Sequence, residues 1–294
     1  MKRGLIGCEI PGSVFAARLS ALYQLCADFD VPALVVYTDV NRANDVRYVS
    51  NFMPYWNRAL TVVPRGEKPI LLCSLSPRVY PWIKSVTIHE TIVASPSLPA
   101  ALKKLCDERG WSRLGVVDRD GLPWELYSEL GDLVDIPRSA FRPDVTASEV
   151  EMHRLGARLA RQGVELELTA GVSDHELTGR IERRLRRGGA EDVVVLVSDG
   201  RGVPRSACGA MVGGDSSVSV ALEYNGHWVK LSRNLAGVTS WQGSAKKELL
   251  SGRYPWDGLV APGVVSIQVA IPHGSSTLYY GDTGVEGPGG WQSL

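Results

Sequence analysis

The order of helical and strand-like segments changes in the middle of this chain, and that change constrains the fold more than any other feature. In the first 141 residues, short β-branched runs alternate with segments whose apolar residues have helical spacing. From residue 146 onwards, two helical segments come first and strand-like runs follow. Alternating elements are typical of an α/β domain, and grouped elements are typical of an α+β domain. The sequence therefore predicts two domains, residues 1–141 and 146–294, joined by a linker at residues 142–145.

The first domain is predicted to contain helices at 14–27, 98–109 and 123–130 and strands at 33–37, 59–63, 70–73 and 114–117. The segment 64–69 contains two prolines and a glycine, so the strands on either side of it are expected to form a hairpin. Gly110 is expected to end the helix at 98–109, because glycine readily adopts the left-handed conformation that follows a helix.

Two capping signals mark the helices of the second domain. Thr146 is followed three residues later by Glu149, and Ser173 is followed by Glu176. This spacing satisfies backbone N–H groups at the start of a helix. Helices are therefore predicted from residue 147 to about 168 and from 174 to about 188, before an antiparallel sheet with strands at 193–197, 217–223, 264–271 and 277–280.

Charge and cysteine content limit the classes of function. The 294 residues include 32 basic and 32 acidic side chains, so nucleic acid is not an expected partner. No run approaches the ~20 apolar residues of a membrane span, and the first residues lack the apolar core of a signal peptide. Five scattered cysteines without a CxxC pair favour free thiols in a reducing compartment. The sequence therefore predicts a cytoplasmic protein with no membrane partner.

A run of arginines near the end of the second predicted helix is the strongest local charge feature. Cations are favoured in the last turn of a helix, so these residues are interpreted as its solvated face. They are Arg180, Arg183, Arg184, Arg186 and Arg187.

Several short segments follow one another in a distinctive order. They are 146–151 (Thr-Ala-Ser-Glu-Val-Glu), 214–215 (Gly-Asp), 223–228 (Glu-Tyr-Asn-Gly-His-Trp), 231–233 (Leu-Ser-Arg) and 259–268 (Leu-Val-Ala-Pro-Gly-Val-Val-Ser-Ile-Gln). Preceded by a small α/β domain and a linker, this series resembles the creatinase and aminopeptidase P family over nearly the whole chain. The resemblance implies an α/β N-terminal domain and an α+β pita-bread domain, here shortened between residues 234 and 258.

The metalloenzymes of that family hold two metal ions with two aspartates, one histidine and two glutamates, and such ions activate a bound water. Carried over to this chain, the aspartates fall on Ser219 or Val220 and on Lys230, and the glutamates fall on Gln268 and Gly281. The segment that carries the histidine has no counterpart. Lysine repels a cation, and the other residues carry no charge. The resemblance therefore implies neither a metal nor another cofactor, and a dimetal peptidase is not expected.

Creatinase itself uses no metal, and resemblance to it implies a histidine proton shuttle shortly before Gly214. Residues 203–210 contain no histidine. The segment 55–58 (Tyr-Trp-Asn-Arg) is similar to the stretch with which creatinase reaches into its partner's active site. By that resemblance, Trp56 and Arg58 are predicted to bind substrate across a homodimer, Arg58 through a bidentate contact with a carboxylate. The alternative is a packed loop tryptophan and a solvated arginine.

His227 and Glu223 are the predicted catalytic residues. By the resemblance, His227 lies on a strand that borders the family's pocket, four residues after Glu223 and six before Arg233. A histidine near a carboxylate can act as a general base at neutral pH. The alternative for His227 is a half-exposed strand residue; Arg233 is predicted to bind substrate, with a structural role as its alternative. The remaining histidines are expected at the surface, namely His89, His153, His175 and His273.

Together these features favour a metal-independent enzyme that acts on a small amino-acid-like or amidine-like metabolite. A non-catalytic relative that binds a small molecule or a protein partner is the alternative, and a chaperone-like peptide binder is a third hypothesis. If Arg58 and His227 prove dispensable, the pocket is expected around Lys230, Gln268 and Asp282.

Overall fold

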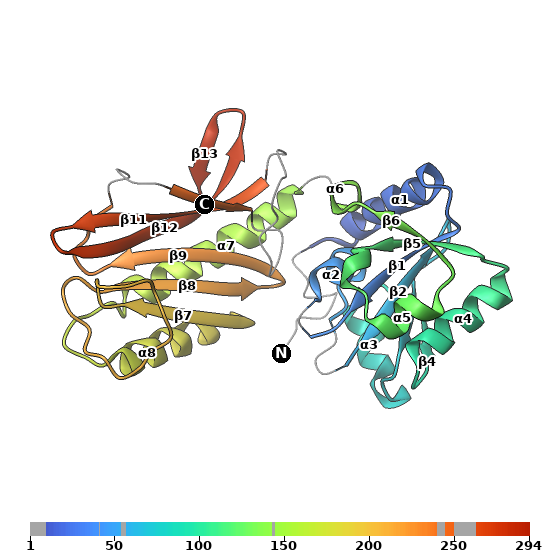
Figure 1. Cartoon of the computed structure of the whole chain (residues 1–294), viewed down its shortest axis with the longest axis horizontal. Helices are drawn as coiled ribbons and strands as arrows, with labels where there is room; N and C mark the ends of the chain where they lie inside the picture. Colours follow the sequence, from blue (N-terminus) through green and yellow to red (C-terminus); the bar gives the residue numbers. More distant parts are fainter. Residues whose placement is uncertain (1–9, 41, 54–56, 143–144, 240–244, 250–262) are drawn as a thin grey trace. The chain divides into compact units, whose positions relative to one another are not determined.

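The computed structural model of the chain describes residues 10–40, 42–53, 57–142, 145–239, 245–249 and 263–294. It consists of two compact units, Lys2–Pro143 and Asp144–Leu294, called here the N-terminal and C-terminal units (Figure 1). Trp56, one of the predicted substrate-binding residues, lies outside the described residues.

A mixed sheet with the strand order β4-β3-β2-β1-β5-β6 forms the centre of the N-terminal unit. Its strands are β1 (Ala33–Thr38), β2 (Ala59–Pro64), β3 (Ile70–Cys73), β4 (Thr91–Ala94), β5 (Arg113–Val117) and β6 (Asp132–Ile136). The predicted hairpin joins β2 to β3, and β1 pairs with β2 antiparallel and with β5 parallel. The central strands are almost continuously apolar, as is typical of strands that are covered on both faces.

Helices cover both faces of this sheet. Leu22, Val46 and Ile83 belong to one core cluster, whereas Leu98 and Leu126 belong to a second cluster with the other side chains of the sheet. The first three helices therefore lie on one face and the next two on the other, in three layers (Figure 1). The helices are α1 (Gly12–Asp28), α2 (Asn44–Ser50), α3 (Tyr80–Val86), α4 (Leu98–Arg109), α5 (Trp124–Glu129) and α6 (Arg138–Phe141).

The longer helices of the N-terminal unit and the apolar strands β3 and β5 agree with the sequence prediction, but several other short elements were not predicted. Helix α4 has the predicted bounds and ends at Gly110, whose φ is 66°. Helices α2, α3 and α6 and strands β4 and β6 are additional, and each has seven residues or fewer. Segments this short contain too few apolar positions to define a period, so tertiary packing decides their structure.

The C-terminal unit has two helices followed by an antiparallel sheet with the order β10-β11-β12-β9-β8-β7, in which β13 pairs with β12. The helices are α7 (Ala147–Glu165) and α8 (Asp174–Arg187). The strands are β7 (Asp192–Ser198), β8 (Ser217–Tyr224), β9 (His227–Asn234), β10 (Ala245–Leu249), β11 (Gly263–His273), β12 (Ser276–Gly287) and β13 (Gly290–Ser293).

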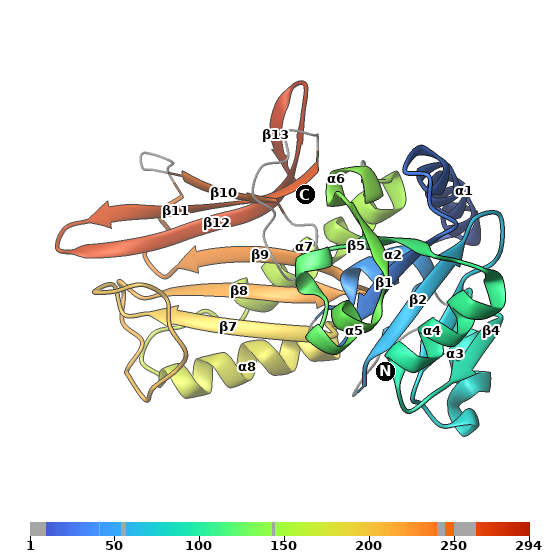
Figure 2. The ribbon, with the colours of Figure 1, turned by 45° about the vertical axis from the view of Figure 1, so that its right-hand side comes forward.

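Both capping predictions are confirmed. Thr146 and Glu149 form a reciprocal capping box at the start of α7, and the Ser173 hydroxyl accepts a hydrogen bond from the Glu176 N–H at the start of α8. Helix α7 packs on β8 and β9, and α8 packs on β7 (Figures 1 and 2). Close packing depends on Gly156, because a Cβ at this position would lie 3.3 Å from side-chain atoms of the sheet.

A tight hairpin connects β8 to β9. Asn225 and Gly226 have φ values of 46° and 85°, and positive φ at both central residues is the signature of the turn that best matches the twist of a two-residue hairpin. The turn sets the register in which Tyr224 faces His227 and Glu223 faces Trp228. Residues that face each other across antiparallel strands point to the same side of the sheet.

Within the described ranges, no helix is both long and apolar enough to cross a membrane. The described cysteines are free thiols. Burial raises the pKa of the Cys26 thiol to about 11, so this residue packs as a small apolar group.

Candidate functional site

The two faces of the C-terminal sheet have different surroundings. His227, Val229 and Leu231 alternate along β9 with Trp228 and Lys230. Val229 lies next to Gly156 of α7, so residues of its parity point towards the helix. We call this side the helix face and the other side the opposite face.

Two neighbouring rows of polar residues cross the opposite face. The first contains Ser219, Ser232, Gly281 and Gln268, which face one another on β8, β9, β12 and β11. The Ser219 and Ser232 hydroxyls are 2.7 Å apart, and the Ser232 hydroxyl donates to Gln268 Oε1 at 2.5 Å. The Gln268 amide donates in turn to the hydroxyl of Ser266 at 2.8 Å. These contacts form one continuous hydrogen-bond chain across four strand positions.

The second row contains Lys230, Thr283 and Ser266. Thr283 and Ser266 face each other on β12 and β11. The Thr283 hydroxyl accepts from the Lys230 N–H at 2.9 Å and donates to the Lys230 carbonyl at 2.8 Å, so it bridges β12 to β9. Thr283 and Ser266 are fully buried, and Lys230 is half-buried.

Gly281 is packed directly against Gln268. A Cβ at Gly281 would lie 2.2 Å from Gln268 Oε1 and 2.5 Å from Gln268 Nε2. The amide of Gln268 therefore fills the space into which a side chain at position 281 would extend. A larger residue at position 281 would force the amide to move and would break its hydrogen bonds to Ser232 and Ser266.

These rows gather the positions that the family resemblance assigned to metal ligands. Ser219, Lys230, Gln268 and Gly281 come from four strands and lie together on one face. Divalent metals in such sites require carboxylate or imidazole ligands. The side chains present do not fit a metal pair, since they are a hydroxyl, an ammonium group and an amide. Among the described residues, no group of three or more His, Cys, Asp or Glu side chains is placed to hold a metal ion.

The structure does not bring the predicted catalytic pair together. Glu223 faces Trp228 and points to the opposite face, whereas His227 faces Tyr224 and points towards α7. The sheet itself therefore separates the carboxylate from the imidazole. Proton transfer within this pair has no direct path in this geometry.

His227 is packed beneath α7. Its Nδ1 lies 2.9 Å from the Asn225 carbonyl, and its Nε2 lies 3.9 Å from Glu149 Oε1. Its ring also packs edge-on against the ring of His153, with 5.0 Å between centroids. Only 11% of the His227 side chain is exposed.

The prediction that all other histidines lie at the surface is wrong for two of them. His153 is buried under the β8–β9 hairpin, where its Nδ1 lies 3.2 Å from the Trp228 carbonyl. His89 is buried in the N-terminal unit between Thr61 and the Pro69 carbonyl, and burial lowers its pKa to about 4. Both rings are held by contacts with residues far away in the sequence, which sequence spacing does not reveal. His175 and His273 are exposed, as predicted.

Arg233 is held within the helix face by several partners. Its guanidinium donates to Asp282 at 3.0 Å and to the Gly281 carbonyl at 2.7 Å. It also lies over the Tyr280 ring, 4.8 Å from the centroid. Arg161 of α7 binds the same Asp282 carboxylate at 3.1 Å, so Asp282 joins two strands to the helix. This geometry favours the structural alternative for Arg233.

Arg58 directly precedes β2 and is about half exposed. Its guanidinium forms an ion pair with Glu125 of α5, within the N-terminal unit. Its other predicted neighbour, Trp56, is outside the described residues. Substrate binding by Arg58 remains a prediction.

The sequence analysis missed the serines and the threonine that complete the two rows. Ser232 directly precedes Arg233, and Thr283 directly follows Asp282. The sequence analysis selected the charged residue of each pair, which lies on the helix face, and overlooked its neighbour. Strand alternation places each neighbour on the opposite face. The detectable signal was polar residues at alternate positions of otherwise apolar strands, as in Ser217, Ser219, Ser266 and Gln268.

Solved peptidases share the fold of this chain over almost its whole length. A Xaa-Pro dipeptidase from Bacillus anthracis has a TM-score of 0.71 at 15% identity, over 95% of this chain and 97% of that chain. A prolidase from Pyrococcus furiosus has a TM-score of 0.73 at 14% identity, over 94% and 98%. An X-Pro aminopeptidase from Thermotoga maritima MSB8 has a TM-score of 0.73 at 13% identity, over 94% and 96%. No family model and no curated protein matches the sequence.

This structural likeness confirms the predicted fold class, an α/β unit followed by a pita-bread unit. Most residues between β9 and β11, where the sequence predicts the shortening, lie outside the described residues.

Proposed function

We propose that this chain works without a bound metal. It shares the pita-bread fold with these peptidases, but the row at the centre of its sheet is uncharged. Its function is to bind a small amino-acid-like or amidine-like molecule at the two polar rows of the opposite face. The observation that carries this proposal is the hydrogen-bond chain from Ser219 through Ser232 and Gln268 to Ser266.

The chemistry of the rows suits such a ligand. Hydroxyl groups both donate and accept hydrogen bonds, and the Gln268 amide offers one acceptor and two donors. An amidine or guanidine presents planar N–H donors that such oxygens accept. Lys230 lies in the adjacent row and supplies the positive charge that a ligand carboxylate requires. Beside the rows, Val194 of β7 shares this face and is 45% exposed, which supports access from this side.

Metal independence is supported by the same residues. A metal pair needs negative or imidazole ligands at the centre of the site, and the matched positions offer Ser219, Lys230, Gln268 and Gly281. An ammonium group at Lys230 opposes any cation bound beside it. We derive no chemical step through a metal.

Binding is favoured over turnover by the placement of His227 and Glu223. The sequence favours an enzyme in which these residues act together, but they lie on different faces of the sheet. The proposal therefore does not use them as a catalytic pair.

Calorimetric titration with creatine, guanidinoacetate and L-arginine tests the proposal. At least one of these probes is expected to bind saturably to protein that elemental analysis shows to be free of stoichiometric transition metal. Gln268→Leu removes two hydrogen bonds from the row and is expected to weaken binding about 10-fold or more. Lys230→Gln should weaken binding of the carboxylate-bearing probes.

Gln292→Leu is the matched control, because it makes the same change at an exposed position of β13. It is expected to leave binding unchanged. Failure of every probe to bind, or one transition metal per chain whose removal abolishes binding, contradicts the proposal. Product release from a bound probe would show turnover and favour the enzyme instead.

The proposed function includes a homodimer in which Arg58 of one chain reaches the ligand held by the other. Its support is the resemblance of residues 55–58 and the partial exposure of Arg58. Light scattering at micromolar concentration is expected to give twice the 31.9 kDa chain mass. A purely monomeric protein contradicts this part of the proposal and leaves ligand binding within one chain to be judged separately.

A further inference from the structure

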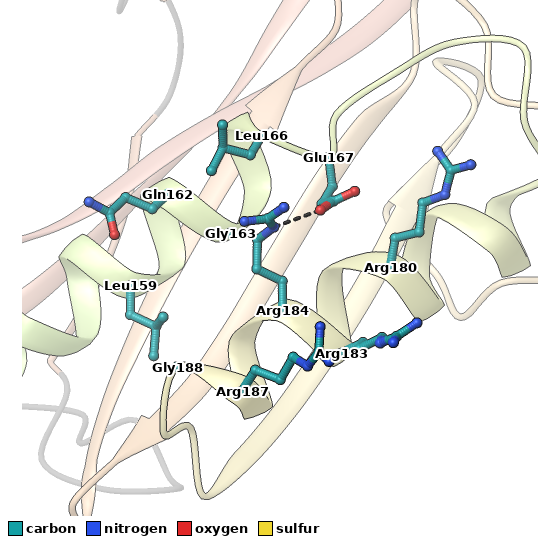
Figure 3. Close-up of a pocket in the computed structure, with 10 residues that line it drawn as sticks. All are labelled: Leu159, Gln162, Gly163, Leu166, Glu167, Arg180, Arg183, Arg184, Arg187 and Gly188. Carbon is teal, nitrogen blue, oxygen red and sulfur yellow. Dashed lines mark hydrogen bonds and ion pairs between the residues drawn. The ribbon is translucent and has the colours of Figure 1, made fainter.

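A groove separates the end of α7 from the outer side of α8 (Figure 3). Its volume is about 610 Å³, within the range of small-molecule sites. None of its lining residues belongs to the two polar rows, so it is a separate feature of the C-terminal unit. The lining residues are Leu159, Gln162, Gly163, Leu166, Glu167, Arg180, Arg183, Arg184, Arg187 and Gly188.

Four arginines form one wall of this groove. They occupy positions 180, 183, 184 and 187, which is the spacing of a single helix face. Their side chains project from α8 along one side of the groove (Figure 3). Like charges at this spacing repel each other, so concentrating them opposes helix stability unless anions compensate.

Among the described residues, carboxylates compensate only some of these charges. Arg184 donates to Glu167 at 2.6 Å across the groove, and Arg180 pairs with Glu176 on its own helix. Arg183 and Arg187 have no carboxylate partner among the residues that the structure describes. Favourable interaction with the end of the helix accounts for cations in its last turn, but Arg180 and Arg183 lie before that turn.

The other wall is mixed: Leu159, Gly163 and Leu166 contribute apolar surface beside the polar Gln162 and Glu167. Leu159 lines the groove from α7, and Leu166 beyond the end of that helix is 67% exposed. Glycine at position 188 lets Leu159 pack closely, since a Cβ there would lie 2.2 Å from Leu159 Cδ1. On one side the groove presents the guanidinium groups of Arg183 and Arg187, which lack a carboxylate partner among the described residues, and on the other the aliphatic surface of Leu159 and Leu166. The Glu167 carboxylate on that second side is already bound to Arg184.

We propose that this groove binds a small phosphate monoester, with the phosphate on Arg183 and Arg187 and the organic group on Leu159 and Leu166. Planar guanidinium groups match phosphate oxygens through paired N–H donors. A phosphate dianion balances the charge of two arginines, which a single carboxylate does not.

The test is calorimetric titration of the full chain with phenyl phosphate, inorganic phosphate and benzoate at low salt. Phenyl phosphate is expected to bind saturably and tightest, because it combines the dianion with an apolar ring. Inorganic phosphate should bind more weakly, and benzoate weakest. Arg183→Gln together with Arg187→Gln should reduce the affinity for phenyl phosphate about 10- to 100-fold.

Arg186→Gln is the matched control, because Arg186 lies in the same turn of α8 but pairs with Asp192 and does not line the groove. Its affinity is expected to stay within about twofold of the wild type, since only a screened long-range charge is lost. An equal loss in Arg186→Gln would show that the helix charge, and not the groove, attracts the anion. That result overturns the proposal. So does equal binding of benzoate and phenyl phosphate, or the absence of saturable binding to the wild type.

Discussion

The helix face and the opposite face of the C-terminal sheet carry polar residues of different kinds. Under α7, the polar groups are charged and paired, as Arg161 and Arg233 are with Asp282. On the opposite face, beside the charged Glu223 and Lys230, they include a chain of hydroxyl and amide groups from Ser219 to Gln268. The comparison shows that a charged residue in a motif does not by itself mark a site. When a helix covers a face of a sheet, the charged side chains on that face pair with one another and become part of the packed interior.

The physical reason is the cost of burial. A charge taken out of water must be paired, and once paired it is committed to its partner. Uncharged hydroxyl and amide groups keep lone pairs and donors that a ligand can share. The helix face therefore stabilises the fold, and the opposite face is where we place binding.

The largest effect is expected from Asp282→Ala on the helix face. The change leaves the guanidinium groups of Arg161 and Arg233 without the buried carboxylate that they share. Loss of one partner of a buried pair costs about 3–5 kcal/mol, measured as the free energy of unfolding in urea. Glu165→Ala removes an exposed partner of Arg233 as a control, and about 1 kcal/mol or less is expected. Similar losses in both variants would contradict a buried charge cluster.

His227→Ala is expected to have the second largest effect. The change removes the edge-on contact with His153 and the contact of Nδ1 with the Asn225 carbonyl. A destabilisation of about 2 kcal/mol is expected by thermal unfolding, from the lost ring pair and the cavity. His273→Ala, at an exposed position, serves as control. Unchanged stability with loss of turnover would instead support His227 as a catalytic residue.

Ser232→Ala tests the opposite face. The variant leaves the Ser219 hydroxyl and Gln268 Oε1 without their shared partner, which costs about 1–2 kcal/mol. Addition of Ser219→Ala removes one of the two groups that lost their partner. The double variant should therefore lose less free energy of unfolding than the two single variants lose in sum. Denaturant unfolding of all three proteins gives the coupling between them. Strictly additive losses would show that the hydroxyls do not form a chain.

Arg58→Ala should have the smallest effect on stability. Its partner Glu125 and Arg58 itself are each about half exposed, and such pairs contribute about 0–1 kcal/mol. Thermal unfolding is the measurement, with the same titration of carboxylate-bearing probes alongside it. Weaker binding with unchanged stability would show that Arg58 contributes to the binding site, in addition to the residues of the opposite face. A large loss of stability would show that Arg58 is a packing residue.

Patterns within single segments determined much of the fold. The capping pairs at Thr146 and Ser173 placed both helices of the C-terminal unit, and the apolar runs placed β1, β2, β8 and β11. Elements such as α2 and β6 were not predicted, because they are short and lack the continuous apolar run that marks β3. The ordered series of weak motifs predicted the pita-bread fold, although no family model matches the sequence.

The candidate site was only half predictable. Carrying the family's ligand positions over residue by residue selected Ser219 or Val220, together with Lys230, Gln268 and Gly281. The strand register brings Ser219 together with the last three, whereas Val220 points to the helix face. The same motif suggested His227 and Glu223 as partners, since they are four residues apart in sequence. The hairpin at Asn225 and Gly226 reverses the chain between them, and sequence distance does not predict the side of a sheet.

The sequence by itself determined which residues are present at each position: the lost carboxylates, the capping residues and the alternation of apolar and polar side chains. Only the tertiary structure decided which polar groups became packing and which remained on the opposite face. That choice depends on where α7 lies across β8 and β9. Burial depends on contacts between segments far apart in the chain, so a local pattern shows which residues share a face of a strand but not which face a helix will cover.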